Sequence, residues 1–283
     1  MPNTKKIAVI TAYLNPSSFF ELLLISGFER KNAEMGGKYK IEQYSTVGSE
    51  GRRKDFMHGV LAGKVADGII SMFLKFDDED TAALRKNNIP VVFIDEEMKG
   101  FHSVTVDNFK GAYMATEYLI KKKKKNIGLV VGQMKTEGVG VTPFERLKGY
   151  KSALQDYGME YHESNVVEIT DYTFEEGEQA LRELLKRGKK FDGVFSAAGD
   201  MVALGIMDEA EREAIDVPHD LAIVGYDDIN MASLSKPPLT TIRQPIEEIG
   251  KESFRLLAET LEGKHKKPRK LIFDPELIER GSA

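Results

Sequence analysis

Short apolar runs alternate with longer amphipathic segments along most of the chain. Runs such as 7–10 and 90–95 contain few polar residues, which is typical of strands buried on both faces of a parallel sheet. The segments between them repeat apolar residues at three- and four-residue spacing, as at Phe20, Leu24 and Phe28, which predicts helices. Strands that alternate with helices indicate parallel pairing through right-handed crossovers.

This pattern predicts the position of most elements. The expected strands cover residues 7–10, 38–44, 67–72, 90–95, 103–108, 127–131, 166–169, 193–196 and 221–224. The expected helices cover residues 20–28, 52–61, 81–88, 109–121, 144–157, 174–186 and 201–212, and a last helix opens at Ile246. The pattern starts again near Asn126 without a low-complexity linker. Together with a length of 283 residues, this predicts two similar lobes joined by several short crossings.

Composition excludes several classes of function. The chain contains no cysteine, so disulfides, thiolate metal sites and a cysteine nucleophile are excluded. No secretory signal opens the chain and no run approaches the ~20 apolar residues of a membrane span, so we expect a cytoplasmic protein without membrane contact. A net charge of -5 argues against nucleic-acid binding by this chain alone. Five consecutive lysines, 121–125, could contact phosphate, but we favour a solvated helix end.

The common signatures of catalysis are missing. The chain has no GxxxxGK[ST], HExxH or GxSxG motif. Its five histidines are isolated in sequence, and the glycines 138 and 140 do not form a dinucleotide motif between a strand and a helix. We therefore expect no enzyme activity, no cofactor and no metal site.

Polar and aromatic side chains instead follow the ends of several expected strands. In open α/β sheets, ligands bind at the carboxyl ends of the strands, and polar ligands need hydrogen-bonding groups beside flat apolar surfaces. We expect the ligand-binding residues to be Asn15, Phe19, Phe20, Phe73, Asp107, Arg146, Tyr172, Asp200, Asp227 and Gln244.

The stretch from Leu221 to Pro245 identifies a family. VGYDDI, then PPLTTIRQP, then a helix opening at Ile246, resembles the effector-binding core of the lactose-repressor (LacI/GalR) family of transcription regulators. The resemblance spans Ile7 to Gly281. It implies an α/β fold of two Rossmann-like lobes with parallel sheets joined by three crossovers, as in type I periplasmic binding proteins. The implied N-terminal lobe holds 1–124 plus 243–265, and the C-terminal lobe holds 125–242 plus 266–283.

The resemblance also assigns roles to residues. In the family, the positions matched by Asp227 and Arg146 are frequent ligand contacts, and the VDN step and the DMVALG helix match at Asp107 and Asp200. The aromatic pair matches at Phe19 and Phe20, although Ser17 and Ser18 separate it from Asn15. The implied function is binding of a small-molecule effector, a sugar or a nucleobase-like metabolite, by a homodimer. DNA would be contacted only through an N-terminal helix-turn-helix, which we do not expect here because the first strand begins at Ile7.

Other interpretations of these residues remain open. Asp107 and Asp200 could simply cap helices, Arg146 could pair with Glu145 or Asp156 at the surface, and Asp227 with Asp228 could be a polar turn. At the level of function, the alternatives are a solute-binding protein for transport and the sensor module of a signalling protein.

Overall fold

The computed structural model describes residues 4–11, 19–46, 49–74, 76–134, 140–265 and 267–283. The chain divides into two compact units. The first comprises Met1–Thr105, Glu137–Val141 and Pro245–Phe273, and the second comprises Val106–Thr136, Thr142–Gln244 and Asp274–Ala283. The backbone therefore passes between the units at several points, as expected for lobes built from interleaved segments.

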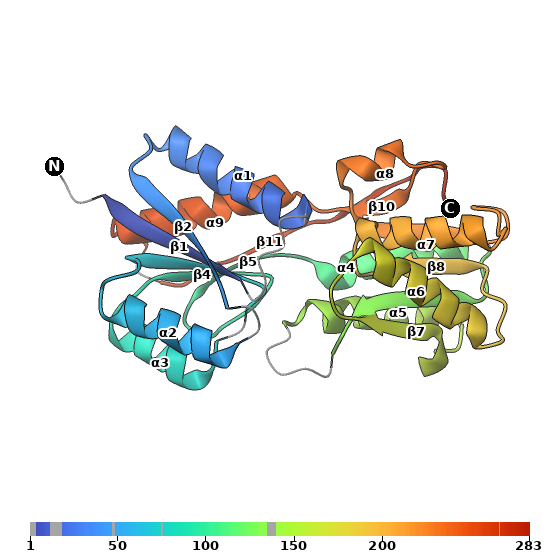
Figure 1. Cartoon of the computed structure of the whole chain (residues 1–283), viewed down its shortest axis with the longest axis horizontal. Coiled ribbons are helices and arrows are strands. Elements are labelled where there is room, and N and C mark those ends of the chain that lie inside the picture. Colours follow the sequence, from blue (N-terminus) through green and yellow to red (C-terminus); the bar gives the residue numbers. More distant parts are fainter. Residues whose placement is uncertain (1–3, 12–18, 47–48, 75, 135–139, 266) are drawn as a thin grey trace. The chain divides into compact units, whose positions relative to one another are not determined.

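A sheet between two helical layers forms the first unit. Its strand order is β11-β5-β4-β3-β1-β2, and the pairs from β5 to β2 are parallel. Helices α1 and α9 lie side by side on one face, and α2 and α3 lie on the other (Figure 1). The bounds are β1 Lys5–Thr11, α1 Phe19–Glu34, β2 Tyr39–Ser45, α2 Glu50–Leu61, β3 Gly68–Met72, α3 Asp78–Lys86, β4 Val91–Ile94, β5 His102–Val106, α9 Ile246–Leu261 and β11 Lys270–Phe273.

The second unit repeats this arrangement, with strand order β12-β10-β9-β8-β6-β7. Strand β12 runs antiparallel to β10, and the other paired strands are parallel. Helices α4 and α5 pack together on one face, and α6 and α7 pack on the other (Figure 1). The bounds are α4 Asn108–Lys121, β6 Ile127–Gly132, α5 Thr142–Asp156, a 3-10 turn Glu163–Asn165, β7 Val166–Ile169, α6 Phe174–Lys186, β8 Gly193–Ser196, α7 Asp200–Arg212, β9 Ala222–Asp227, α8 Asn230–Leu234, β10 Thr240–Arg243 and β12 Glu276–Ile278.

The apolar runs become the central strands of both sheets. Every residue of β3 and of β6 is buried, because helices cover both faces of each sheet. In the second unit, one core cluster lies under α6 and α7 and includes Val202 and Leu184. Another lies under α4 and α5 and includes Leu119 and Tyr150. The expected fold class is confirmed: each unit is a three-layer α/β structure with a mainly parallel sheet.

The expected lobe boundaries differ from the structure at two places. Helix α4 was expected in the first lobe but belongs to the second unit, because its apolar face, with Ala112, Ala115 and Leu119, is part of the core that contains Tyr150. The closing strand was expected in the second lobe from residue 271. Instead β11 joins β5 in the first sheet, and β12 joins the second.

The lysine run follows α4 as a charged helix end. Lys121 pairs with Glu117 at 2.9 Å, and the Lys122 ammonium lies 4.9 Å from the centre of the Tyr118 ring. The described helices include none that is long and apolar enough to cross a membrane.

Candidate ligand-binding site

The carboxyl ends of the second unit's parallel strands meet at one edge of the sheet. Strands β8, β9 and β10 end beside each other there, so the residues that follow them lie close together. Ser196 ends β8, Asp227 ends β9 and Arg243 ends β10. This edge collects most of the residues that the sequence pattern singled out.

Arg146 is locked at this edge by three contacts. Its side chain comes from α5 and only 6% of the residue is exposed. The guanidinium donates from Nε to Asn108 Oδ1 at 2.8 Å and from Nη1 to the Ala197 carbonyl at 2.7 Å. It also stacks over the Tyr226 ring, 3.7 Å from the ring centre. The alternative that Arg146 is a surface ion-pair residue is wrong.

The VDN step forms the support for this arginine. Asp107 caps α4 by accepting the Lys110 backbone N–H at 2.8 Å, so the capping interpretation holds for it. Asn108 is buried, and its Oδ1 also accepts from the Tyr226 hydroxyl at 3.5 Å. Asn108 was not among the expected site residues. The asparagine beside Asp107 in the motif was the signal that could have identified it.

Asp200 ties three elements together below the edge. It is 1% exposed, and its carboxyl group accepts the Thr241 hydroxyl at 2.6 Å and the Ile229 N–H at 2.9 Å. Burial, followed by the negative charge of Asp227, raises the pKa of Asp200 well above its usual value. Asp200 is not a helix cap, because Gly199 occupies that position at φ +106°. Its carboxyl group therefore acts mainly inside the protein.

Asp227 and Gln244 form a polar pair at the surface of the edge. The Gln244 Nε2 donates to Asp227 Oδ1 at 2.6 Å. Gln244 is 3% exposed, and its Oε1 is buried without a hydrogen-bond partner in the described part of the chain. The neighbouring Asp228 is held by Arg243 at 2.7 Å and Arg280 at 2.5 Å. Asp228 is thus tied to two arginines, whereas Asp227 is bonded to the amide of Gln244.

Tyr172 lies across the end of β6. Its hydroxyl occupies the place that a side chain at Gly132 would take, since a Cβ added to that glycine would come within 1.8 Å of it. The residue is 44% exposed overall, whereas burial of the hydroxyl end raises the pKa of Tyr172. An aromatic face with a polar tip is thus held beside the arginine.

The corresponding edge of the first unit carries aromatic residues. The rings of Phe20 and Phe73 meet edge to face with centroids 5.4 Å apart, and Phe19 is exposed. Asn15 lies outside the described residues. Asp95, which follows β4, is buried, and its Oδ1 accepts the Thr105 hydroxyl at 2.8 Å. Asp95 was expected to be the last residue of the strand at 90–95. The acidic residues at the end of that apolar run could have marked Asp95 as a candidate site residue.

Unusual backbone geometry recurs at these strand ends. Phe73, Asp95, Tyr172 and Asp227 have φ of 54°, 54°, 56° and 113°. Positive φ is unfavourable for residues other than glycine and is concentrated at binding and catalytic sites. This geometry supports both edges as functional surfaces.

The second unit's edge offers carboxylate and amide acceptors, a fixed guanidinium and aromatic surface. The described residues hold no group of three or more His, Cys, Asp or Glu side chains that could bind a metal ion. Ligand contact by the ten expected residues stays a prediction. Asp107 caps α4, and Asp200 accepts hydrogen bonds from Ile229 and Thr241, so the side chains of both already have partners within the protein.

Two three-layer units of this topology, with the backbone passing between them several times, define a type I periplasmic-binding-protein-like fold.

The family model for the periplasmic binding protein-like domain matches residues 116–283. The transcriptional regulator CelR of Thermobifida fusca is 32% identical over 288 residues, covering 99% of this chain and 81% of CelR. The HTH-type transcriptional repressor PurR of Escherichia coli O1:K1 is 32% identical over 228 residues, covering 79% of this chain and 65% of PurR. The solved structure of a CelR–cellobiose complex superposes with a TM-score of 0.86 at 30% identity, covering 100% of this chain and 86% of that one.

The chain belongs to the periplasmic binding protein-like domain family and, within it, to the LacI-type transcriptional regulators.

Proposed function

We propose that this chain is the effector-binding core of a LacI-type transcription regulator and that its effector is a sugar or a related polar metabolite. The observation that carries the proposal is the similarity to CelR along 99% of the chain. The name of the related structure describes a complex of CelR with cellobiose. A compound of that class is therefore the first effector to test.

The second unit's edge fits a polyhydroxylated ligand. Sugar hydroxyls donate hydrogen bonds, and Asp227 and the buried Gln244 Oε1 are acceptors. Arg146 supplies a planar donor whose position is fixed by Asn108. The exposed face of Tyr172 offers an apolar surface for the flat side of a sugar ring.

Effector binding regulates by shifting an equilibrium between two states of the chain. A ligand moves such an equilibrium only by its difference in affinity for the two states. We propose that a dimer transmits this shift to DNA through helix-turn-helix segments, in line with the "HTH-type" names of the relatives. Light scattering on the purified chain tests the dimer, and a monomer at all concentrations would contradict it.

The test of effector binding uses Asp227. In isothermal titration with cellobiose and a panel of related sugars, we expect one sugar to bind. Asp227→Asn should weaken that binding by ~1–3 kcal/mol, because the ligand hydroxyl loses a charged acceptor. Asparagine tolerates positive φ, so the backbone at 227 is not disturbed. The matched control is Asp156→Asn, which removes an exposed carboxylate on α5 and should leave the affinity unchanged.

A nucleobase is the second candidate effector. It is favoured by the aromatic pair of Phe20 and Phe73, because flat bases stack on aromatic rings. Hypoxanthine and guanine in the same titration separate the two classes. Binding of neither sugars nor bases would contradict the proposed function.

A further inference from the structure

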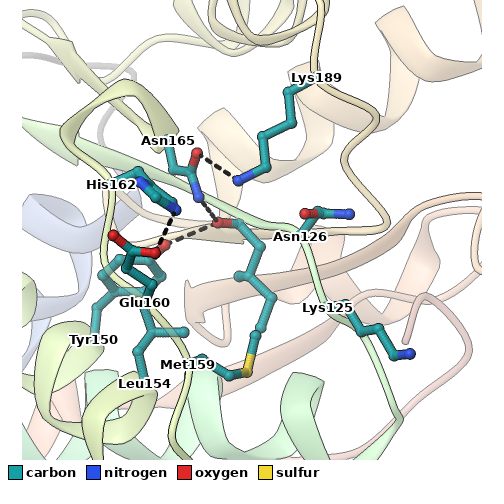
Figure 2. A pocket seen from close by; sticks show the side chains of 10 residues that line it. Lys125, Asn126, Tyr150, Leu154, Met159, Glu160, His162, Asn165 and Lys189 are labelled. Carbon is teal, nitrogen blue, oxygen red and sulfur yellow. Dashed lines mark hydrogen bonds and ion pairs between the residues drawn. The ribbon is translucent and has the colours of Figure 1, made fainter.

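A cavity of about 310 Å³ opens at the amino end of the second unit's sheet. It is lined by Ile127, the first residue of β6, whereas the candidate ligand-binding site lies at the carboxyl end of the sheet. The other lining residues come from α5 and from the segments around the 3-10 turn and after α6 (Figure 2). The cavity is thus separate from the proposed effector site and rests on none of its residues.

The floor of this cavity is apolar and its polar atoms are already engaged. Ile127, Tyr150 and Leu154 are at most 2% exposed. The Tyr150 hydroxyl donates to the Ile127 carbonyl at 2.8 Å, and burial raises the pKa of Tyr150, so the ring stays neutral. Asn165 donates to the same carbonyl at 3.4 Å. Ile127, Tyr150 and Leu154 therefore support the cavity from beneath and present almost no surface to a ligand, whereas the partly exposed Met159 lines the cavity with accessible carbon.

The rim of the cavity carries positive charge that is not neutralised within the protein. Lys189 reaches toward Asn165, and its Nζ donates to the amide oxygen at 3.3 Å (Figure 2). No ion pair of Lys189 or Lys125 with a carboxylate is found among the described residues. By contrast, Arg187 pairs with Glu183. The ammonium of Lys189 therefore has only a neutral partner at a long distance.

The acidic side of the rim is weaker. Glu160 is exposed, and its carboxylate lies 3.7 Å from His162 Nε2. Lys125 directs its amine away from the other lining side chains (Figure 2), but its charge adds to the field at the rim. Asp192 also lies here, because its carboxylate accepts the backbone N–H groups of Lys125 and Asn126. Its charge offsets that of Lys125, so Lys189 is the rim cation that lacks a carboxylate partner among the described residues.

We propose that this cavity binds a small organic anion, with its apolar body on Met159 and its charge paired with Lys189. The volume lies at the lower end of the roughly 300–1,000 Å³ found for ligand pockets, which suits a single substituted ring. A carboxylate gives the Lys189 ammonium the charged partner it lacks. The Asn126 amide at the rim can donate to the second carboxylate oxygen.

The experiment uses benzoate, benzyl alcohol and acetate as probes of ring plus charge, ring alone and charge alone. Met159 lines the cavity, so its methyl group, assigned with Met159→Leu, reports binding in ¹³C-methyl-methionine NMR spectra. We expect benzoate to shift this resonance in a saturable way, with at least tenfold weaker binding of the other two probes.

Two lysine variants test whether Lys189 supplies the positive charge that binds benzoate. Lys189→Gln should weaken benzoate binding at least fivefold, while Lys190→Gln, an exposed neighbour that does not line the cavity, should leave it unchanged. Unshifted spectra of the other methionines verify that both variants fold. Equal binding of benzyl alcohol and benzoate, unchanged affinity in Lys189→Gln, or no shift at Met159 would each overturn the proposal. Asp227→Asn should not alter benzoate affinity, which keeps this test independent of the effector.

Discussion

Arg146 contributes to stability as well as to the candidate site. Its guanidinium bonds to Asn108 and to the Ala197 carbonyl, and it covers the Tyr226 ring. Removing it takes the guanidinium donor from the Ala197 carbonyl and leaves Asn108 Oδ1 with only the long bond from the Tyr226 hydroxyl. A buried acceptor that loses its donor costs ~1–3 kcal/mol. Arg146→Ala should therefore lower the free energy of unfolding in urea by about 2–3 kcal/mol, in addition to weakening effector binding.

The control for Arg146 lies on the same helix. Lys148 is exposed, and within the described ranges its one ion pair is with Glu145, three residues before it. Lys148→Ala should therefore change the unfolding free energy by less than ~0.5 kcal/mol. If both variants were equally stable, the contacts of Arg146 would not be stabilising.

Asp200 should make stability depend on pH. Its folded pKa is raised by burial and by the charge of Asp227, so the folded state holds a proton that the unfolded state has lost. Between the unfolded pKa, ~3.9, and the folded pKa, the free energy of unfolding therefore falls as pH rises. Asp200→Asn carries no charge and keeps an oxygen that accepts the Ile229 N–H. Its amide nitrogen faces the Thr241 hydroxyl, which then accepts instead of donating.

Urea unfolding of both proteins from pH 4.5 to pH 8 isolates this effect. Groups other than Asp200 titrate in both, so the difference between the two curves belongs to Asp200 and to its coupling with Asp227. We expect the variant to gain stability relative to the wild type as pH rises. Parallel curves would show that the two states bind the Asp200 proton equally.

The sequence predicted the structural positions of some candidate site residues but not of others. Asp227 was singled out because it follows an apolar run, Arg146 because it opens a helix, and Gln244 because it lies on a crossing between the lobes. Their contact with a ligand stays a prediction. The backbone angles of Phe73 and Asp95 were not visible, since neither is a glycine and tertiary contacts fix their φ. The structural position of Asp200 was missed because its partners, Ile229 and Thr241, are distant in sequence.

At the scale of elements, glycines set how closely paired helices approach. A Cβ at Gly205 of α7 would lie 1.9 Å from the Phe174 carbonyl of α6, and one at Gly177 of α6 would lie 2.1 Å from the Val202 carbonyl of α7. Because the obstacle is backbone, it cannot move aside as a side chain would. Gly205→Ala should separate α6 from α7 and lower the unfolding free energy by ~3 kcal/mol, the upper part of the range for overpacked cores.

Gly51 supplies the matched control. It lies in α2, and the nearest atom to an added Cβ is 3.7 Å away. Gly51→Ala should stabilise the protein by ~0.5–1 kcal/mol, because alanine loses less conformational entropy in a helix. Chemical denaturation of the pair separates the steric effect from helix propensity. The two expected effects have opposite signs, so a similar change in both variants would contradict the close-packing argument.

Elements with strong periodicity were predicted closely. The expected strands at 166–169 and 193–196 and the helix at 174–186 match β7, β8 and α6. Helix α8 was missed because it spans only Asn230–Leu234, too short for a helical repeat to show. The end of the chain was assigned to a single strand, whereas β11 and β12 pair with different sheets. Strand pairing is a tertiary property, so a short polar strand gives no local sign of its partner.

At the scale of the whole molecule, the division into units depended on which core each helix joins. Helix α4 reads as amphipathic in the sequence, but the pattern does not say which sheet its apolar face covers. Its contact with α5 and with the core around Tyr150 decides the assignment. The general architecture was predictable because alternating strands and helices allow few other folds, and the exact crossing points were not.

The net negative charge of the chain predicts weak binding to DNA. The chain carries -5, and its five-lysine run is partly used internally, since Lys121 pairs with Glu117 and the Lys124 ammonium donates to the Pro218 carbonyl. The five-lysine run therefore has few lysines left that could release counterions from DNA. We expect this chain alone to bind a mixed-sequence duplex no tighter than ~10⁻⁴ M at physiological salt. Fluorescence anisotropy at two salt concentrations measures this. Micromolar affinity with a steep salt dependence, lost when Lys122, Lys123 and Lys125 are changed to glutamine, would instead make the lysine run a DNA contact and remove the need for a separate DNA-binding segment.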